Sequence, residues 1–436
     1  MNDSEACMKI LLTGASGFIG RHLLTALLDA GHDVVCAVRK ARAAARPGLS
    51  QVVVDFNKAQ HPQDWMPALN GVDVVVNAVG ILRELPGQTF DTLHRAAPIA
   101  LFTAAAEIGV RHIVQISALG ADEQAASRYH LSKKAADDFL LALPVQATIA
   151  QPSLVYGPGG ASAALFERYA SMPLIPLPGG GTQQVQPVHI DDVVSVLLRL
   201  IESAPGPDRR VAIVGPEPIS LRSFYAALRR AMGFSSPARF VAIPMPIMRM
   251  VARIGNRLPG GFLDTETLDM LQRGNTADAA ATQSLLGHRP RAPRQFVPSR
   301  YADAVAAQAR LRWLLPMLRW AVGLVWIVTG LVSLGLYPVE QSYALLARSG
   351  VPPPLQPLFL YGAAALDVLL GVLALLPRRS RLIWLAQATL VLAYTAIITV
   401  KLPEFWLHPY GPVLKNLPFL AALWILYELE DRTWTT

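Results

Sequence analysis

A tyrosine and a lysine stand four residues apart in SRYHLSKKAADDF, residues 127–139. In a helix each residue turns about 100°, so Tyr129 and Lys133 would be about 40° apart on one face, and Lys134 about 140° from Tyr129. A tyrosine hydroxyl can protonate the alkoxide that forms as hydride reaches a carbonyl, and a neighbouring lysine would lower its pKa from about 10. Pairs of this spacing also occur on solvated helix faces, so the pair alone fits both a catalytic and a structural interpretation.

Three glycines at three-residue spacing follow the first predicted strand, KILLTG, and open a predicted helix in TGASGFIGRHLL. Glycine permits positive φ in the turn and lets the backbone approach a pyrophosphate, while the helix N-terminus attracts phosphate. A glycine turn with a purely structural role is the alternative. The sequence predicts a dinucleotide site made by Gly14, Ser16, Gly17, Phe18, Ile19 and Gly20.

The ends of the following strands indicate which dinucleotide binds. The second strand ends in CAVRKARAAAR, where Arg39, with Lys40 or Arg42, can pair with a 2'-phosphate; an acidic residue there would favour NAD. This favours NADP(H) as the cofactor, with NAD(H) as the alternative and a solvated basic loop as the structural interpretation. We expect Asp55, at the end of the third strand, near the adenine, and Ala78 beneath the cofactor.

Short apolar runs alternate with helix-period segments from residue 9 to about residue 300, which is typical of a parallel sheet wrapped by helices. The predicted strands are KILLTG, HDVVCAVR, QVVVDF, DVVVNAVG, HIVQISALG and ATIAQPSLVYG, and helices are expected to begin near Phe18, Asp91 and Ser127. Glycine- and proline-rich loops after residue 156 indicate a small substrate lobe, mainly in residues 157–300. The predicted fold class for residues 1–300 is α/β, a Rossmann-type doubly wound parallel sheet.

The composition changes after about residue 309, where long apolar runs begin. Several are close to the ~20 residues that a helix needs to cross a bilayer. They are Trp320–Val339, Gly350–Pro377, Leu382–Val400 and the shorter Asn416–Tyr427. A soluble helical bundle with a buried core is the alternative. We expect a linker at residues 301–315 and an all-α transmembrane four-helix bundle at residues 316–436.

Arginine placement predicts the orientation of this bundle. The arginines that precede the first span or follow the second are Arg310, Arg312, Arg319, Arg378, Arg379 and Arg381. By the positive-inside rule both termini are then cytoplasmic. The N-terminus, MNDSEACMKI, lacks the basic and apolar regions of a secretory signal. The sequence therefore predicts a multi-pass protein of the cell inner membrane whose N-terminal domain is cytoplasmic.

Neither a nucleic acid nor a metal is an expected partner. The formal charge of +8 fits nucleic acid, anionic lipid or a phosphorylated ligand, but the chain carries no nucleic-acid-binding signature. Cys7 and Cys36 lack metal or redox spacing. His189, Asp191 and Asp192 in VHIDDVV could be read as a metal cluster, but capping of the following helix by one of the aspartates is the favoured interpretation.

Six motifs resemble, in order and spacing, those of an extended or atypical short-chain dehydrogenase/reductase over roughly residues 9–300. They are TGASGFIG, NAVGILRE, QISALGA, YHLSKKAADD, QPSLVYGPGG and VQPVHIDDVV. VGILRE and ISALGAD look like the branch that includes the nucleotide-binding accessory subunit of respiratory complex I. The resemblance implies NADP(H), a catalytic pair at Tyr129 and Lys133, and a substrate lobe. Leu119 stands where the family's active-site serine is common, so Ser117 is the nearest hydroxyl to orient a carbonyl, and Gln151 replaces a frequent arginine.

The membrane region resembles the DoxX-like four-helix module, on RWAVGLVWIVTGLVSL and AAALDVLLGVLALL. Asp367 lies mid-span, where a carboxylate is unfavourable and usually faces the bundle interior. It could stay protonated, pair with Lys415 or Arg348, or line a quinone or proton site. A buried structural hydrogen bond is the alternative.

We expect a membrane-anchored NAD(P)H-dependent oxidoreductase that transfers hydride to or from a carbonyl, alcohol or quinone-like substrate, small or lipid-soluble. A non-catalytic NADPH-binding structural or assembly subunit, in contact with other membrane-protein subunits, is the alternative. In a third interpretation the membrane bundle is the active part, through Asp367, and the Rossmann domain is a sensor.

Overall fold

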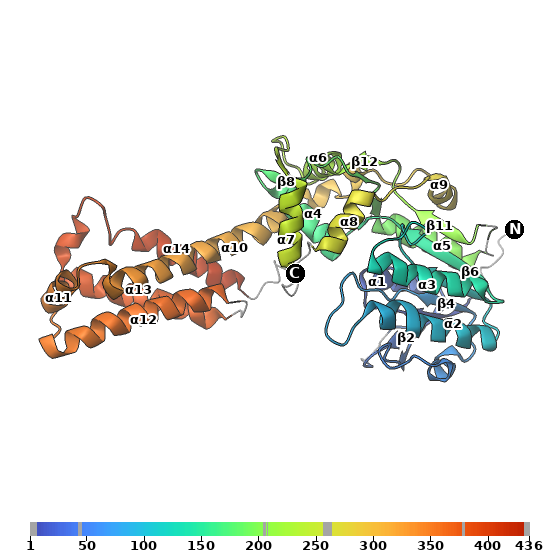
Figure 1. The fold of residues 1–436 in the computed structure, drawn as a ribbon, viewed down its shortest axis with the longest axis horizontal. Helices are drawn as coiled ribbons and strands as arrows, with labels where there is room; N and C mark the ends of the chain where they lie inside the picture. Colours follow the sequence, from blue (N-terminus) through green and yellow to red (C-terminus); the bar gives the residue numbers. More distant parts are fainter. Residues whose placement is uncertain are drawn as a thin grey trace. The chain divides into compact units, whose positions relative to one another are not determined.

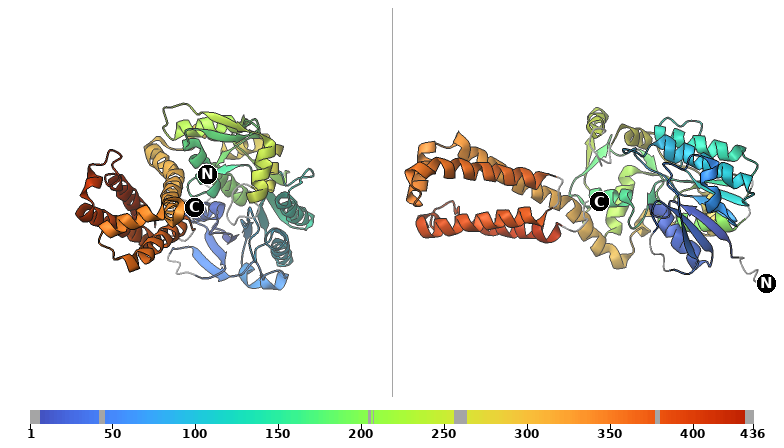
Figure 2. Two further views of the ribbon diagram at one scale, coloured as in Figure 1. Left: turned by 60° about the vertical axis from the view of Figure 1, so that its left-hand side comes forward. Right: turned by 90° about the horizontal axis from the view of Figure 1, so that it is seen from below.

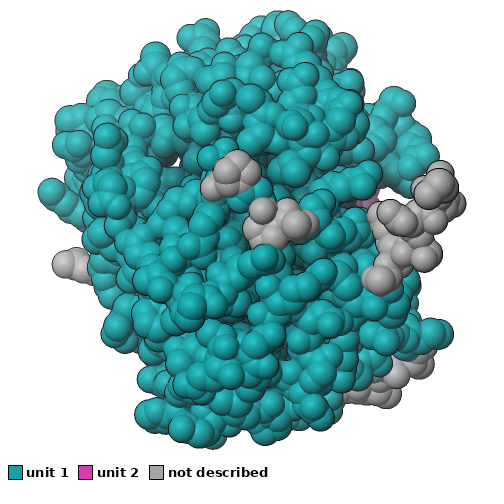
Figure 3. All heavy atoms as spheres, turned by 90° about the vertical axis from the view of Figure 1, so that its right-hand side faces the viewer, with its two compact units in different colours: residues 1–306 teal, residues 307–436 magenta. Residues whose placement is uncertain are grey.

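The computed structural model describes residues 7–41, 46–203, 206, 208–255, 264–376 and 380–430. The chain forms two compact units, residues 1–306 and residues 307–436, which we call unit 1 and unit 2. Unit 1 combines a large sheet with covering helices and small strand pairs, whereas unit 2 is helical (Figure 1). Figure 3 shows one face of unit 1, coloured teal.

Seven parallel strands form the large sheet of unit 1, in the spatial order β11-β6-β5-β4-β1-β2-β3. Their bounds are Lys9–Thr13 (β1), Asp33–Val38 (β2), Leu49–Val53 (β3), Val74–Asn77 (β4), His112–Ile116 (β5), Gln146–Pro152 (β6) and Arg210–Ile213 (β11). Strand order reverses between β1 and β4, and doubly wound folds bind ligands at the carboxyl ends of the strands on either side of such a point. The predicted Rossmann-type parallel sheet is confirmed.

Side chains of β1 alternate between two apolar cores. Ile10 and Leu12 belong to the core shared with helices α1 (Phe18–Asp29) and α5 (Ile190–Glu202). Leu11 belongs to the core shared with α2 (Ala97–Glu107) and α3 (Arg128–Ala142), which lie side by side (Figure 1). A π-helical turn, Asp91–Ala96, leads into α2. Because both faces of the sheet are covered, its central strands β1, β4 and β5 consist largely of buried apolar residues.

The smaller lobe of unit 1 is built from short strand pairs and helices that follow β6 (Figure 2). The pairs are β7 (Val155–Tyr156) with β10 (Val188–His189), β8 (Ile175–Pro178) with β13 (Phe240–Ile243), and β9 (Gln184–Val185) with β12 (Ile219–Ser220). The helices are α4 (Ala161–Ser171), α6 (Leu221–Ala231), α7 (Met245–Gly255), α8 (Thr265–Arg273) and α9 (Ala280–Leu286). These elements lie in the part of the chain where the sequence predicts a substrate lobe.

Helix α5 is capped by a histidine. The Nδ1 atom of His189 accepts a hydrogen bond from the backbone N–H of Asp191 at 3.3 Å. Asp192 is buried and accepts from the backbone N–H of Arg291 at 2.8 Å, and its carboxylate also pairs with that guanidinium. The prediction that Asp191 or Asp192 caps this helix is therefore wrong, because the preceding histidine fills the cap and Asp192 is bound to Arg291.

Unit 2 is a set of helices. They are α10 (Ala302–Leu331), α11 (Val339–Arg348), α12 (Gln356–Leu375), α13 (Arg381–Lys401) and α14 (Asn416–Leu429). Within the described residues, the three helical stretches long and apolar enough to cross a membrane are Ser299–Leu336, Pro353–Leu375 and Arg381–Lys401, and α14 is a shorter apolar helix. Helix α10 includes residues 302–315, nearly all of the segment 301–315 that the sequence predicts as a linker. Arg378 and Arg379, used for the predicted orientation, lie outside the described residues.

Small residues let α10 and α12 pack closely. A Cβ atom added at Gly371 would lie 2.8 Å from the carbonyl oxygen of Gly323, and one added at Gly330 would lie 2.8 Å from that of Ala364. Such small-residue contacts are typical of membrane helix pairs. Asp367 is buried on α12, and its Oδ1 has no hydrogen-bond partner among the described residues. Arg348, one of its predicted partners, pairs with Glu404 instead.

Candidate active site

Lys133 connects helix α3 to the loops after two central strands. Its side chain is buried, and Nζ donates hydrogen bonds to the carbonyl oxygens of Val79 at 3.0 Å and Ile116 at 3.2 Å. Burial lowers the pKa of Lys133 to about 8, opposed by the negative charge of Asp137. Helix α3 begins directly after Ser127, whose Oγ caps the helix by accepting a hydrogen bond from the backbone N–H of His130 at 3.1 Å. The lysine is thus a fixed, mostly protonated donor at the carboxyl end of the sheet near neutral pH.

Tyr129 lies one turn before Lys133 and is held by aromatic contacts. Its ring centroid is 6.0 Å from that of Phe90, 5.5 Å from that of His94 and 5.3 Å from that of His130. Burial and the charge of Asp137 raise the pKa of Tyr129 to about 12, opposite in direction to the lowering by Lys133 that the sequence analysis expects. The phenol is therefore protonated at neutral pH, the form that a proton donor needs.

His94 is a neighbour that the sequence analysis missed. It is buried, its Nδ1 lies 2.9 Å from the hydroxyl of Ser132, and its Nε2 accepts from the backbone N–H of Ile81 at 2.9 Å. Burial, and then the charge of Lys133, lower the pKa of His94 to about 2. This histidine is a neutral support that fixes the loop after β4 and packs against Tyr129. Its place in a helical segment far from the recognised motifs gave no signal of this role.

Ser117, the predicted carbonyl-orienting residue, is engaged by another side chain. Its Oγ donates a hydrogen bond to the carboxylate of Asp137, and both residues are buried. Burial raises the pKa of Asp137 to about 6, opposed by the hydrogen bond from Ser117 and by the charges of Lys133 and Arg210. Asp137 also escaped the sequence analysis, although its position one turn after Lys133 on the same face could have indicated it.

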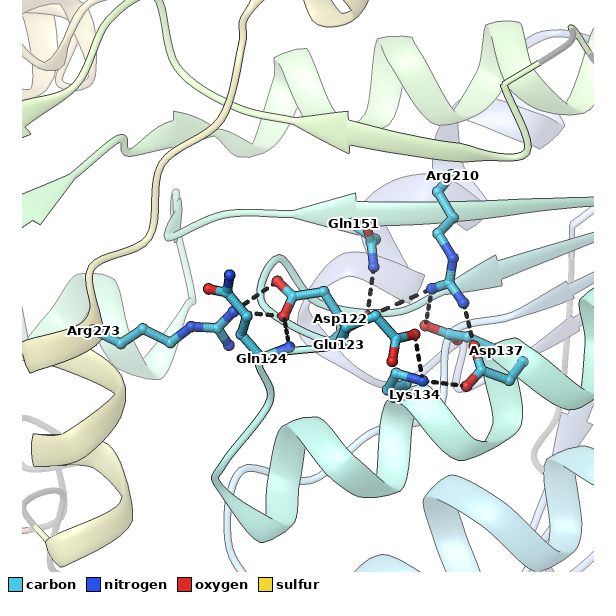
Figure 4. Close-up of polar contacts among 10 residues, drawn as sticks. Asp122, Glu123, Gln124, Lys134, Asp137, Gln151, Arg210 and Arg273 are labelled. Carbon is cyan, nitrogen blue, oxygen red and sulfur yellow. Dashed lines mark hydrogen bonds and ion pairs between the residues drawn. The ribbon is translucent and has the colours of Figure 1, made fainter.

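Asp137 links the buried site to a surface ion-pair network (Figure 4). Arg210, on β11, lies 3.6 Å from Asp137 and also binds Asp138. Lys134 pairs with Asp138 at 2.5 Å and with Glu123 at 2.8 Å. Lys134 thus faces this exterior network while Lys133 faces the sheet, as the helical angles predict.

Three buried polar side chains tie together the carboxyl ends of β1, β4 and β5. The hydroxyl of Thr13 donates to Oδ1 of Asn77 at 2.6 Å, and Nδ2 of Asn77 donates to Oε1 of Gln115 at 2.7 Å. Buried polar groups that are paired in this way fix the relative positions of the strands that carry them. The network holds the strand ends from which the surrounding loops emerge.

The glycine-rich loop has a shape that only glycine permits. Gly14 has φ of 69°, and a Cβ atom there would lie 2.6 Å from the carbonyl oxygen of Ala78. A Cβ atom at Gly20 would lie 2.1 Å from the carbonyl oxygen of Gly14. Ser16 and Gly17 are exposed on this loop. The close approach of β1, β4 and α1 leaves an open backbone turn at a helix N-terminus, which fits the pyrophosphate of a dinucleotide.

The other predicted cofactor residues lie at neighbouring strand ends. Phe18 and Ile19 begin α1 and are half-buried against the core of that face. Arg39 is exposed directly after β2, and Asp55 follows β3, where its carboxylate accepts from the backbone N–H of Asn57 at 3.1 Å. Arg42, which could join Arg39 in pairing with a 2'-phosphate, lies outside the described residues.

The structure connects three of the predicted residues through neighbouring contacts. Gly14 lies against Ala78, and the carbonyl oxygen of the next residue, Val79, accepts a hydrogen bond from Lys133. The glycine loop and helix α3 are thus joined through the loop after β4. Arg39 and Asp55 stand at the ends of β2 and β3, on the other side of β1.

A hollow of about 640 Å³ opens in the smaller lobe. Its lining includes Gln183, Met245 and Arg273. The guanidinium of Arg273 donates to the carbonyl oxygen of Gly120 at 2.8 Å and pairs with Asp122, which fixes this wall to the loop between β5 and α3 (Figure 4). The hollow therefore adjoins the loop that leads into the Tyr129 helix. No group of three or more potential metal ligands occurs among the described residues.

Two protein families match this chain. Residues 10–215 match the NAD dependent epimerase/dehydratase family, and residues 323–424 match the DoxX-like family. Among solved structures, a nucleoside-diphosphate-sugar epimerase from Staphylococcus aureus aligns with a TM-score of 0.53 at 17% identity, over 66% of this chain and 99% of that protein. At that identity the likeness shows the fold of unit 1 alone.

Two curated relatives have a higher sequence identity to this chain. A ceramide reductase of Caulobacter vibrioides is 29% identical over 196 residues, which cover 45% of this chain and 61% of that protein. The mitochondrial NADH dehydrogenase (ubiquinone) 1 alpha subcomplex subunit 9 of Arabidopsis thaliana is 27% identical over 250 residues, 55% of this chain and 61% of that protein. The chain thus spans about three-fifths of the length of these two relatives.

Proposed function

The chain joins an N-terminal domain of the NAD dependent epimerase/dehydratase family, of the extended short-chain dehydrogenase/reductase type, to a C-terminal DoxX-like membrane domain, and we propose that it is a membrane-bound NAD(P)H-dependent reductase of lipid carbonyls. The observation that carries this proposal is the chain of contacts from Gly14 through Ala78 and Val79 to Lys133, one helical turn from Tyr129. A nicotinamide cofactor and a proton donor would then meet at the carboxyl end of the sheet.

In the proposed reaction the cofactor, when bound, would supply hydride to the carbonyl carbon. Tyr129 would deliver a proton from its hydroxyl to the carbonyl oxygen as charge develops there. Lys133, whose ammonium group donates to the carbonyl oxygens of Val79 and Ile116, would also hydrogen-bond the cofactor's ribose. His94 and Phe90 fix the orientation of the tyrosine ring.

The glycine loop would hold the pyrophosphate, with Ser16, Gly17, Phe18 and Ile19 at the start of α1. Arg39, exposed after β2, would pair with a 2'-phosphate, so NADP(H) is the proposed cofactor. Asp55 would lie toward the adenine and Ala78 beneath the dinucleotide. The nucleotide would bind within residues 1–300 and the membrane domain would comprise residues 316–436, with helix α10 beginning inside the segment 301–315 that the sequence predicts as a linker.

A lipid substrate is the proposed class for two reasons. The chain is a membrane protein with three apolar helices of spanning length among its described residues, and a relative is a ceramide reductase. We place the protein in the cell inner membrane with unit 1 in the cytoplasm, where NADPH is available.

Replacing Tyr129 with Phe tests the reaction. The full chain in lipid nanodiscs should oxidise NADPH with a panel of long-chain ketones and quinones, and Tyr129→Phe should lower kcat by about 100-fold or more, the typical contribution of a general acid. NADPH affinity should stay within about twofold. Tyr301→Phe, at a half-exposed tyrosine of unit 1, is the matched control and should not change kcat.

One observation favours a second candidate function, a non-catalytic NADPH-binding subunit of a membrane complex. The hydroxyl of Ser117 is bound to Asp137, and Leu119 stands where a further hydroxyl would orient a carbonyl. A relative is itself named as a subunit of NADH dehydrogenase. If NADPH co-purifies and Tyr129→Phe leaves its slow oxidation unchanged with every substrate tested, the subunit function is correct and the reductase function is not.

A further inference from the structure

Helix α7, Met245–Gly255, carries an apolar face that the described residues leave exposed. Ile247, Met250, Val251 and Ile254 follow the i, i+3, i+4, i+7 spacing of a single helix face. Their exposed fractions are 47%, 57%, 44% and 54%. Ala252, on the opposite side, is fully buried. Single exposed apolar residues are ordinary on a protein surface, but four on one face over two turns indicate an interaction surface.

The charges of α7 are all positive. Its sequence, MPIMRMVARIG, contains two arginines and no acidic residue. At about 100° per residue, Arg253 lies about 110° from the centre of the apolar face and Arg249 about 150° from it. Both arginines are exposed, and Arg249 reaches Gln272 on α8 at 3.3 Å. An apolar face on a short helix whose only charges are arginines outside that face is the pattern of a helix lying in the interface of a membrane.

We propose that α7 lies in the interfacial layer of the bilayer, with Ile247, Met250, Val251 and Ile254 among the upper acyl chains and the two arginines at anionic lipid headgroups. A membrane is a partner that this chain can meet, since its helices α10, α12 and α13 are long and apolar enough to span one. Anionic lipid complements the two positive charges of α7, which no acidic residue of this helix balances, whereas a second copy would add two more positive charges. The charge of the helix therefore favours lipid over a second copy.

The lipid contact of α7 does not depend on the proposed reductase function. Met245, its first residue, lines the hollow of about 640 Å³ that adjoins the loop before the Tyr129 helix, but at about 100° per residue it lies about 170° from the centre of the apolar face. The hollow therefore takes no part in the proposed lipid contact.

The test uses the full chain in nanodiscs with a spin label at Met250→Cys in a Cys7→Ser background. Cys36, the other cysteine, is buried at 3% exposure and stays unlabelled in the folded protein. Oxygen partitions into the bilayer and a nickel chelate into water, so the ratio of their relaxation effects reports depth. In bilayers with about one-third anionic lipid, the Met250 label should respond more to oxygen. Ile108→Cys, an exposed apolar position at the end of α2, is the control and should respond more to nickel.

Lipid composition identifies what the arginines contribute. In purely zwitterionic bilayers the oxygen-to-nickel ratio at Met250 should fall at least twofold, and Arg249→Gln with Arg253→Gln should lower it similarly in anionic bilayers. A Met250 label as open to nickel as the Ile108 label would overturn the proposal. So would an immobilised Met250 label shielded from both reagents, because that result means a protein partner, such as a second copy, covers the face. None of these readouts depends on turnover, so they stand or fall separately from the reductase function.

Discussion

Asp137→Asn is the substitution that separates the electrostatic role of this buried carboxylate from its shape. Asparagine keeps an oxygen that accepts from Ser117 but removes the negative charge that faces Lys133 and Arg210. In the folded protein burial raises the pKa of Asp137 to about 6 from its ordinary 3.8. The ionised form is therefore less favourable in the folded chain than in the unfolded chain.

The sign and size of the stability effect follow from these two pKa values. A raised carboxyl pKa contributes stability that is fully present below about pH 4 and is lost as the pH rises through about 6. At 1.36 kcal/mol per pH unit, the stability of unit 1 that is lost relative to low pH is about 1 kcal/mol at pH 4.5 and about 3 kcal/mol at pH 7.5. Asparagine cannot ionise, so Asp137→Asn should stabilise unit 1 by these amounts, and more at pH 7.5 than at pH 4.5.

The two cysteines of the chain provide an assay for unit 1 alone. In a Cys7→Ser background, a thiol-reactive fluorophore reacts only when Cys36, buried on β2, becomes exposed by unfolding of unit 1. About 1 kcal/mol shifts the midpoint of a domain of this size by roughly 2 °C. Asp137→Asn should therefore raise the midpoint by roughly 6 °C at pH 7.5 and by roughly 2 °C at pH 4.5.

The neighbouring carboxylate is the control for this experiment. Asp138→Asn removes a charge from the half-exposed pairs with Lys134 and Arg210, which contribute about 0–1 kcal/mol to stability. The change in midpoint that it causes should be the same at pH 4.5 and pH 7.5. An Asp137→Asn midpoint that is unchanged or lower at pH 7.5 would refute the reasoning, because it would mean that the buried carboxylate stabilises the fold. The same substitution should lower the pKa values of Tyr129 and Lys133, since Asp137 raises both, and so move the alkaline limb of the rate profile to lower pH.

Three further substitutions test the glycine loop, the 2'-phosphate contact and the bundle. Gly14→Ala should weaken NADPH binding by more than about tenfold in calorimetry, because its Cβ atom would meet the carbonyl oxygen of Ala78; Gly31→Ala, with φ of 86° and no atom within 4 Å, is the control and should leave the dissociation constant unchanged. Arg39→Gln should raise the Kd for NADPH by about tenfold and that for NADH by less than twofold; equal changes would refute the 2'-phosphate contact. Gly371→Leu should lower the melting midpoint of unit 2, read by tryptophan fluorescence, because α10 approaches within the space of a Cβ atom there.

Patterns of residue type were enough to predict the frame of the fold. The apolar runs that became β1, β2, β4 and β5 are continuous because both faces of a parallel sheet are buried, and the glycine spacing placed α1 directly after β1. The angle between Tyr129 and Lys133 also required only that α3 be helical, and it is. These features depend on local sequence, so the sequence specifies them.

Side-chain partners across distant elements could not be predicted in the same way. The Ser117 hydroxyl has several residues within reach of its strand, and only the packing of α3 on the sheet selects Asp137. His94 reaches Tyr129 from a turn 35 positions earlier, and the raised pKa of Tyr129 comes from burial that no spacing reveals. The predicted cap of α5 was wrong for a similar reason. An aspartate was expected there, but His189 caps the helix and Asp192 is bound by Arg291.

The bond from Ser117 to Asp137 also bears on how a carbonyl could be bound. A serine that donates its only proton to a carboxylate can still accept a hydrogen bond, but it has no proton for a carbonyl oxygen. In that arrangement the Tyr129 hydroxyl is the remaining donor of the pair, and a ketone would be oriented mainly by its apolar chains. Protonation of Asp137, whose pKa is about 6, would remove the charge that holds the serine proton. Reduction of a carbonyl by the wild type should therefore slow as the pH rises through about 6, and Asp137→Asn should abolish this step while its alkaline limb moves to lower pH; a wild-type rate that rises between pH 5.5 and pH 7 would contradict this role for Ser117.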